Sequence, residues 1–260
     1  MTLTARHAWL ERDGLLWSPM LGILGLVAGF TTRAQGSMAG SNHPLETQAA
    51  NRAALAERLG FDEVVRTKQV HGRDVAHVER LMEPWPVADA MWTERSGVLL
   101  GIAAADCVPV LVADPRGPIG AAHAGWQGTT FGVATALVEA MVDGGAQRGR
   151  LVAALGPSIG PCCYTIDEQR AEIVSARIGG DALRETVVDG VRRYVFDLWS
   201  ANAAQLRAAG VERIEVAGLC TLSGGADLWS YRGRGSDGVY GTQLGFIGRG
   251  GARPRSGEPT

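Results

Sequence analysis

The sequence predicts a single α+β domain. Short β-branched runs outnumber helical patterns, and most are joined by turn signals typical of hairpins, which favours α+β over a doubly wound sheet. The 260 residues are 46% hydrophobic and 20% charged, enough to bury a substantial core. No linker or shift in composition divides the chain. We therefore expect one domain over residues 1–247 and a disordered C-terminal tail over 248–260.

The first third of the chain is expected to contain strands, a loop and one helix. Asp13-Gly14 is a hairpin signal that ends a short first strand. The apolar run 15–30 is interpreted as one or two core strands, because a membrane helix needs about 20 residues. A loop rich in Gly and Ser follows. Apolar residues spaced by three and four then predict a helix over 44–59, ended by Gly60.

The middle of the chain alternates short strands with turns. Asp114-Pro115-Arg116-Gly117 has the residues that a type I turn prefers at its first, second and fourth positions. Folding about this turn should bring Cys107 to within about one residue of the position opposite His123, where directly opposed Cβ atoms lie ~5 Å apart. Strands are expected at 64–70, 75–78, 102–105, 108–113 and 118–123.

The last part of the chain adds three helices and further strands. Thr129 or Thr130 is expected to cap a helix that ends at Gly144-Gly145, and Asp167 and Asp197 to cap helices over 167–178 and 197–209. Asp189-Gly190 is a second hairpin signal. Strands are expected at 151–155, 186–188, 192–196, 214–217 and 227–232.

Composition excludes several classes of function. A net charge of −2, few aromatics and no basic run argue against nucleic-acid binding, and the apolar run 15–30 does not predict a membrane anchor. The four cysteines form no CxxC pair, which favours reduced thiols and a cytoplasmic protein. Cys162-Cys163 is expected to pack in the core. Five histidines without a His-x-His pair cannot supply the roughly ten ligands of a multicopper oxidase.

Two histidines and one cysteine are the candidate metal-binding or catalytic residues. His71 ends a predicted strand before a glycine, and His123 precedes small residues that clear space around it. With Cys107 they could form a zinc site that keeps a fourth position open for water. A Cys107–His123 nucleophile pair fits the same residues. A buried, inert cysteine is the third alternative, which the neighbouring Asp106 argues against.

An anion site is expected at the start of the helix that follows His123. Free backbone N–H groups over residues 125–130 suit phosphate or carboxylate, although a simple capped helix start is the more common explanation of such a pattern. Four arginines could converge there as ligands, or remain surface charges. They are Arg33, Arg52, Arg232 and Arg234.

Several motifs in a fixed order carry a resemblance to a known family. They are Phe30-Thr31-Thr32-Arg33, Asn51-Arg52, Gln69-Val70-His71-Gly72, Ala105-Asp106-Cys107-Val108-Pro109-Val110, Ala122-His123-Ala124-Gly125-Trp126, Gly156-Pro157-x-Ile159-Gly160, Cys163-Tyr164 and Cys220-Thr221. Over roughly residues 15–245 the chain resembles the laccase-domain family of purine nucleoside phosphorylases, also called polyphenol oxidase-like or peptidoglycan editing factor proteins.

The resemblance implies a four-layer α/β/β/α sandwich with mixed sheets, and a zinc ion on His71, Cys107 and His123, which are then also the catalytic residues. It implies purine nucleoside and phosphate as substrates, with adenosine deamination as a further activity. Arg33, Arg52, Gln69 and Gln127 are the expected substrate-binding residues, and a monomer is favoured. Two departures concern the substrate pocket. Gln127 stands where the family usually has Arg, and Ser41-Asn42-His43-Pro44 replaces a Leu-Asn-Leu stretch.

Three functions therefore remain open. A zinc-dependent phosphorylase is the first, with Asp89 and Asp106 as candidates for the general acid. A Cys-His or zinc hydrolase of cell-wall precursors is the second, as the editing-factor name suggests. A non-catalytic zinc-binding protein is the third.

Overall fold

A computed structural model describes residues 9–40, 42–79, 84–224 and 227–250. It confirms a fold that mixes helices with mixed and antiparallel sheets. Within the described ranges, no helix combines the length and apolar composition that a membrane span requires. The described helices are α1 (Pro19–Ile23), α2 (Leu45–Leu59), α3 (Trp126–Phe131), α4 (Val133–Asp143), α5 (Glu168–Ile178) and α6 (Leu198–Ala208).

The described strands form three sheets. The first has the order β1 (Leu10–Arg12), β2 (Leu15–Trp17), β3 (Leu26–Thr31), β15 (Gln243–Arg249), β7 (Leu99–Ala104) and β4 (Val64–Val65). The second has the order β14 (Arg213–Val216), β10 (Val152–Leu155), β8 (Val108–Ala113), β9 (Ile119–Ala124), β6 (Ala90–Thr93) and β5 (Val75–His77). The small third sheet has the order β11 (Thr165–Ile166), β13 (Val191–Phe196) and β12 (Leu183–Val188).

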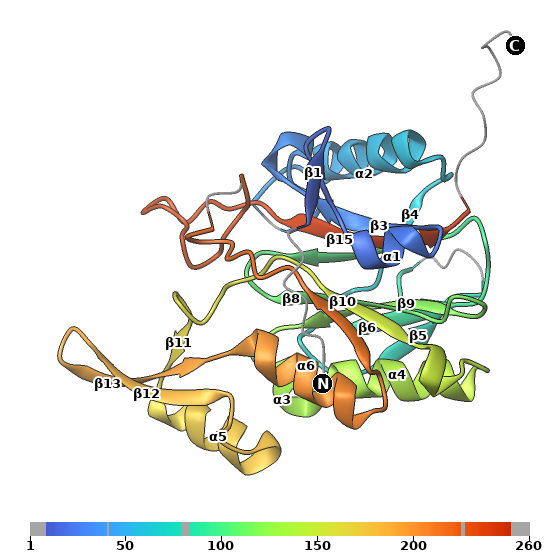
Figure 1. Ribbon diagram of the computed structural model, residues 1–260. Helices are drawn as coiled ribbons and strands as arrows, with labels where there is room; N and C mark the ends of the chain where they lie inside the picture. The colour runs from blue at the N-terminus through green and yellow to red at the C-terminus, as the bar shows by residue number, and fades with distance from the viewer. Residues whose placement is uncertain (1–8, 41, 80–83, 225–226, 251–260) are drawn as a thin grey trace, which may run out of the picture.

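The two large sheets stack face to face between helices (Figure 1). Helix α2 lies over the outer side of the first sheet, and α3, α4 and α6 lie along the outer side of the second. The third sheet projects to one side with α5. Strands β7, β8 and β9 are buried along their whole length. A strand covered on both faces reads as a continuous apolar run, which is why these three were visible in the sequence.

Elements with local signals match the expectations closely. Asp13 and Asp189 adopt positive φ beside their glycines, as two-residue hairpin turns require. Asp167 and Asp197 accept hydrogen bonds from N–H groups in the first turns of α5 and α6. Gly60 ends α2 in the left-handed conformation.

Several expected elements were wrong in type or in length. The run 15–30 contains helix α1 between two strands, because Ser18 caps it and Pro19 occupies its first turn. The expected strand 64–70 shrinks to β4. Thr129 and Thr130 lie inside α3, which begins after Gly125 instead. Residues 227–232 form a loop, in which the Gln243 side chain binds both backbone groups of Trp229.

Three strands were missed altogether. The two-residue strand β11 pairs with β13. β6 lies beside β9, and β15 occupies the centre of the first sheet between β3 and β7. Gly248 pairs with Val27 and Leu99, so the ordered chain passes the expected tail boundary at 247/248. The rest of the expected tail, from residue 251, lies outside the described residues. Close packing explains the glycine-rich sequence of β15, since a Cβ at Gly245 would lie 2.7 Å from Pro109 Cβ.

The turn after β8 contains a buried carboxylate that holds three segments together. Asp114 is fully buried, and Arg150 donates to it through Nε at 2.9 Å and through NH2 at 2.7 Å. The N–H groups of Arg116 and Gln147 also donate to it, each at 2.9 Å. Burial alone would raise the pKa of Asp114, but these bonds outweigh it and lower the pKa.

Asp114→Asn is expected to lower the free energy of unfolding by about 1.5–3 kcal/mol at pH 7, because hydrogen bonds to a charged group are lost. The folded pKa is below the unfolded value of about 3.9, so the carboxylate stabilises the fold above that pH. Its contribution disappears as the pH falls toward the folded pKa. Urea unfolding at pH 7 and pH 3 should show the difference from wild type shrinking at the lower pH. A constant difference would contradict the charge-based explanation.

Candidate active site

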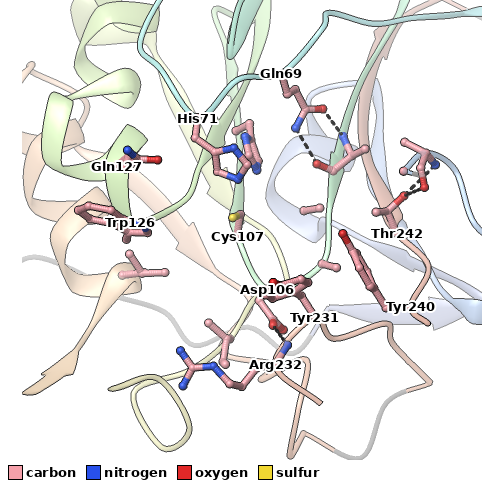
Figure 2. A pocket seen from close by; sticks show the side chains of 18 of the residues that line it. Gln69, His71, Asp106, Cys107, Trp126, Gln127, Tyr231, Arg232, Tyr240 and Thr242 are labelled. Atoms are coloured by element: carbon pink, nitrogen blue, oxygen red, sulfur yellow. Dashed lines mark hydrogen bonds between the residues drawn. The ribbon is translucent and has the colours of Figure 1, made fainter. Parts of the chain in front are cut away.

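The structure brings His71, Cys107 and His123 together at the ends of three segments. Their ligand atoms all lie within 4.8 Å of one another, and the two imidazole centroids are 4.8 Å apart. His123 is on β9, Cys107 directly precedes β8, and His71 lies in the loop before β5. Figure 2 shows His71 above the Cys107 sulfur, with Trp126 and Gln127 on one side and Gln69 on the other.

The strand register differs from the expected one. His123 lies opposite Pro109, and Val108 lies opposite Ala124. Cys107 is therefore two residues from the position opposite His123, and the expectation of one residue was wrong. An offset of two residues keeps both side chains on one face of the sheet, so the thiol and the imidazole still meet, along a diagonal.

Gly125 creates the space for this cluster. A Cβ at that position would lie 2.7 Å from Cys107 Sγ and 3.3 Å from His71 Cδ2. Its φ of −75° is open to any residue, so the glycine is required for space and not for conformation. The small residue after Ala124 therefore forms part of the cradle around the sulfur.

Asp89 organises two of the three side chains. It is fully buried, and its Oδ1 accepts from His123 Nδ1 at 2.9 Å. This bond directs the other ring nitrogen of His123 toward the cluster, as an outer carboxylate does for a histidine ligand. Its two oxygens also accept backbone N–H groups from Val70 at 3.0 Å, His71 at 2.9 Å and Gly72 at 2.6 Å.

These bonds decide the role of Asp89. They hold His71 at a φ of 63°, a conformation that is uncommon outside glycine. Burial alone would raise the pKa of Asp89, but the bonds from His123, Gly72 and Val70 lower it to about 2. A carboxylate whose two oxygens already accept four N–H groups is suited to hold other residues in place. This bonding favours a positioning role for Asp89 over the role of general acid.

The cluster favours a thiolate. Burial alone would raise the pKa of the Cys107 thiol, yet the charge and hydrogen bonds of His123 and His71 lower it to about 6. Burial would likewise lower the pKa of His123, but the charge of Cys107 and the bond to Asp89 raise it to about 9. A thiolate is the form of cysteine that ligates metals and attacks electrophiles, so both interpretations of the site remain chemically competent.

Asp106, just before Cys107, is also strained and fully engaged. Its φ is 87° and it is buried. Oδ1 accepts from Thr221 Oγ1 and Oδ2 accepts from the Arg232 N–H, both at 2.6 Å. Backbone strain in a buried, doubly bonded residue is typical of functional sites, where the surroundings impose the conformation. Asp106 thereby joins the Cys107 segment to the loop that carries Arg232.

A cleft of about 1040 Å³ opens beside the cluster and is lined by all three candidate ligands. Its size and mixed lining suit a small molecule with an aromatic part and a charged part. The cationic residues of its lining are Arg66, Lys68, Arg170 and Arg232. The aromatic residues of its lining, apart from the histidines, are Trp85, Trp126, Tyr164, Tyr231 and Tyr240.

The four expected substrate-binding residues have different environments. Gln69 and Gln127 line the cleft, and the Gln69 amide also pairs with both backbone groups of Ala103, at 2.8 and 2.9 Å. Arg52 lies behind the lining and donates to Met38 O at 2.6 Å. Arg33 stacks over Trp229 at 4.2 Å and pairs with Asp227, apart from the residues that line the cleft.

The buried Arg66 lies beside the half-buried Arg52, and of these two only Arg52 was expected to bind substrate. Arg66 and Arg52 both donate to Met38 O and lie 4.7 and 5.6 Å from the Trp85 ring. Arg66 is 8% exposed, and its Nε has no hydrogen-bond partner among the described residues. Burial and then the charge of Arg52 lower the pKa of Arg66 to about 10. Two neighbouring guanidinium cations repel each other, and burial removes part of their hydration. Binding of an anion beside them would offset both effects.

The neighbouring Arg66 and Lys68 carried a weak signal in the sequence, since Lys68 directly precedes the Gln69-Val70-His71-Gly72 motif. The aromatic lining had no such signal, because Trp85 is remote in the chain from the segment that carries Tyr231 and Tyr240. Arg234, expected near the anion, stacks on Tyr231 at 3.9 Å and is outside the lining.

Comparisons with known proteins agree in family and fold. The model of the family described as multi-copper polyphenol oxidoreductase laccase matches residues 27–250. A protein of Deinococcus radiodurans named purine nucleoside phosphorylase is 42% identical over 215 residues, which are 78% of this chain and 82% of that protein. Purine nucleoside phosphorylase YlmD of Geobacillus stearothermophilus is 34% identical over 250 residues, 86% of this chain and 90% of that protein.

Solved structures extend the similarity to the fold. The crystal structure of YlmD from Geobacillus stearothermophilus superimposes with a TM-score of 0.80 at 33% identity. The match covers 93% of this chain and 98% of that one. The crystal structure of Bacillus licheniformis YfiH gives a TM-score of 0.79 at 29% identity, over 92% of this chain and 97% of that one.

Proposed function

The chain belongs to the multi-copper polyphenol oxidoreductase laccase family, and from that membership we propose that it is a zinc-dependent purine nucleoside phosphorylase that can also deaminate adenosine. The observation that carries the proposal is the cluster of His71, Cys107 and His123 at the wall of a cleft with cationic and aromatic linings. The relatives named purine nucleoside phosphorylase point to the same substrates.

The donor set fits zinc. Two imidazoles and a thiolate are ligands that zinc prefers, and three protein ligands leave a position for substrate, as catalytic zinc sites do. Asp89 supplies the outer hydrogen bond that fixes a ligating histidine. Zinc held there would supply Lewis-acid chemistry, to polarise a substrate oxygen and to activate the water that deamination at purine C6 requires.

The rest of the cleft offers groups for the two substrates. A purine ring can stack on the aromatic residues that line the cleft. In Figure 2, Trp126 lies to the left of Cys107 and Tyr231 lies to its lower right. Phosphorolysis needs phosphate beside the ribose. Arg66, with Arg52 behind it and Lys68 beside it in the lining, is an under-neutralised cationic group suited to that anion. Asp106 has both oxygens engaged, so it positions the Cys107 segment.

The position of phosphate can be tested with paired variants. Arg66→Ala is expected to raise the KM for phosphate about 10–100-fold, because a charge-assisted bond contributes about 1.5–3 kcal/mol. Arg33→Ala, outside the lining, should leave that KM unchanged. Arg66→Lys keeps the charge and should recover part of the loss. Circular dichroism checks folding of each variant, because Arg66 is buried.

The anion expected at the start of α3 stays a prediction and has its own test. Gln127→Arg would place a cation at that helix start, and a lower KM for phosphate would favour an anion there. No change in Gln127→Arg together with a strong effect of Arg66→Ala would favour the arginine pair. The reverse pattern would contradict our assignment to Arg66.

The activity itself is tested by supplying adenosine or inosine with and without phosphate, before and after chelation. Ribose 1-phosphate that requires both phosphate and metal supports the proposal. Inosine formed from adenosine supports the deaminase activity. The pKa of about 6 at Cys107 favours one rival, a Cys-His hydrolase of cell-wall precursors. Activity that survives chelation but is lost on alkylation of Cys107 would favour that hydrolase. If the protein turned over neither nucleosides nor cell-wall precursors, a non-catalytic zinc-binding role would remain.

A further inference from the structure

The other three cysteines of the chain form a cluster outside the candidate active site. Cys162 and Cys163 are in the turn between β10 and β11, and Cys220 follows β14. Their sulfur atoms all lie within 4.8 Å of one another. The expectation that Cys162-Cys163 packs in the core was wrong for Cys162, which is exposed. Cys163 is half-buried and packs against the core, and Cys220 is buried in it. Apolar packing therefore does not explain the position of the exposed Cys162 thiol.

Polar groups complete the surroundings of the three sulfurs. Ser223 Oγ lies 3.3 Å from both Cys162 Sγ and Cys163 Sγ. The backbone N–H of Gly160 donates to Cys220 Sγ at 3.3 Å, a bond that favours a thiolate. A Cβ at Gly160 would lie 3.2 Å from Cys162 Sγ, so the glycine leaves room for the sulfur to fold back over the turn. Three sulfurs and one hydroxyl oxygen thus lie close together.

We propose that Cys162, Cys163 and Cys220 bind a second zinc ion, with the Ser223 hydroxyl as the fourth ligand. Zinc–sulfur bonds of about 2.3 Å in a tetrahedron place sulfurs about 3.8 Å apart. The thiols need to approach by at most about 1 Å from their present limit of 4.8 Å. Thiolates are the ligands that hold zinc most firmly in structural sites, and a set without an open position is structural.

The second site joins a loop that lines the cleft to a loop that bonds the neighbour of Cys107. The segment with Cys162 and Cys163 also carries Ile159 and Tyr164, which line the cleft. The segment with Cys220 carries Thr221, whose hydroxyl donates to Asp106, the neighbour of Cys107. A bridge between Ser158 and Cys220 already pairs the two segments. Zinc here would therefore fix these two loops while taking no part in the reaction.

The test is metal analysis of reduced, desalted protein in variants that separate the two sites. Cys107→Ala removes a ligand of the first site, and the protein is expected to retain zinc. Adding Cys163→Ala to it should remove that remaining zinc. Cys163→Ala alone should keep zinc at the first site and lose thermal stability. This inference does not depend on the phosphorylase assignment, because no step of the test measures turnover.

Labelling provides a second readout in the Cys107→Ala protein, for the case that Cys163→Ala does not fold. Bound zinc protects thiolates, so alkylation of the exposed Cys162 should be slow and should accelerate at least about tenfold after chelation. Cys107→Ala protein that contains no zinc would overturn the proposal. A mass lower by two hydrogens, which indicates a disulfide among the three thiols, or copper in place of zinc would overturn it equally.

Discussion

Cys107→Ala is expected to remove zinc from the first site and to lower kcat/KM for inosine by at least about a thousandfold. The thiolate is the only anionic ligand in the cluster, and Lewis-acid assistance contributes several kcal/mol, where about 1.4 kcal/mol is a factor of ten. His71→Ala should act in the same direction through the loss of an imidazole. Metal content and steady-state kinetics with inosine and phosphate measure both effects.

His77→Ala is the matched control for the histidine variant. His77 lies on β5, stacks on Trp92 with centroids 3.9 Å apart and bonds to Glu94 at 2.7 Å, outside the cleft lining. Its loss should cost about 1 kcal/mol of stability and leave zinc content and kcat/KM unchanged. Full activity in Cys107→Ala protein that has lost the zinc of the first site would contradict the metal-dependent mechanism. Activity lost in Cys107→Ala but insensitive to chelation in wild type would favour the cysteine nucleophile.

Asp89→Asn is expected to weaken zinc binding at the first site about 10–100-fold and to lower the free energy of unfolding by about 3–5 kcal/mol. The reason is geometric. Oδ2 accepts the N–H groups of Val70 and Gly72, and Oδ1 accepts His71 N and His123 Nδ1. An asparagine amide must present its NH2 group to one of these two donor pairs in either orientation. Buried donors then face a donor, and the conformation of His71 loses its support.

Asp114→Asn separates the two effects. Asp114 is equally buried but binds Arg150, away from the cluster. It should therefore reduce stability and leave zinc affinity unchanged, whereas Asp89→Asn should change both. Competition with a chromogenic chelator measures the affinity, and urea unfolding of the metal-free proteins measures the stability. Equal zinc affinity in wild type and Asp89→Asn would show that this carboxylate does not position the ligands.

The structure agrees with the sequence-based predictions where an element depends on interactions between residues that are close in the chain. The Asp13-Gly14 and Asp189-Gly190 turns, and the Asp caps of α5 and α6, depend on hydrogen bonds and φ angles within a few residues. These could be predicted. β15 could not, because its glycines weaken the pattern of a strand, and what favours them is close approach to Pro109 and Phe61 from other segments.

The site divides in the same way. The sequence by itself determined which chemistry was available, since two histidines and one cysteine stand beside small residues at the ends of predicted strands. Only the tertiary structure decided what surrounds them. It gave Asp89 four donors, brought Arg66 beside Arg52, and gathered three cysteines from two loops. Donor types are a property of each residue, but ion pairing, desolvation and ligand spacing depend on distances between segments remote in the chain, which no local pattern encodes.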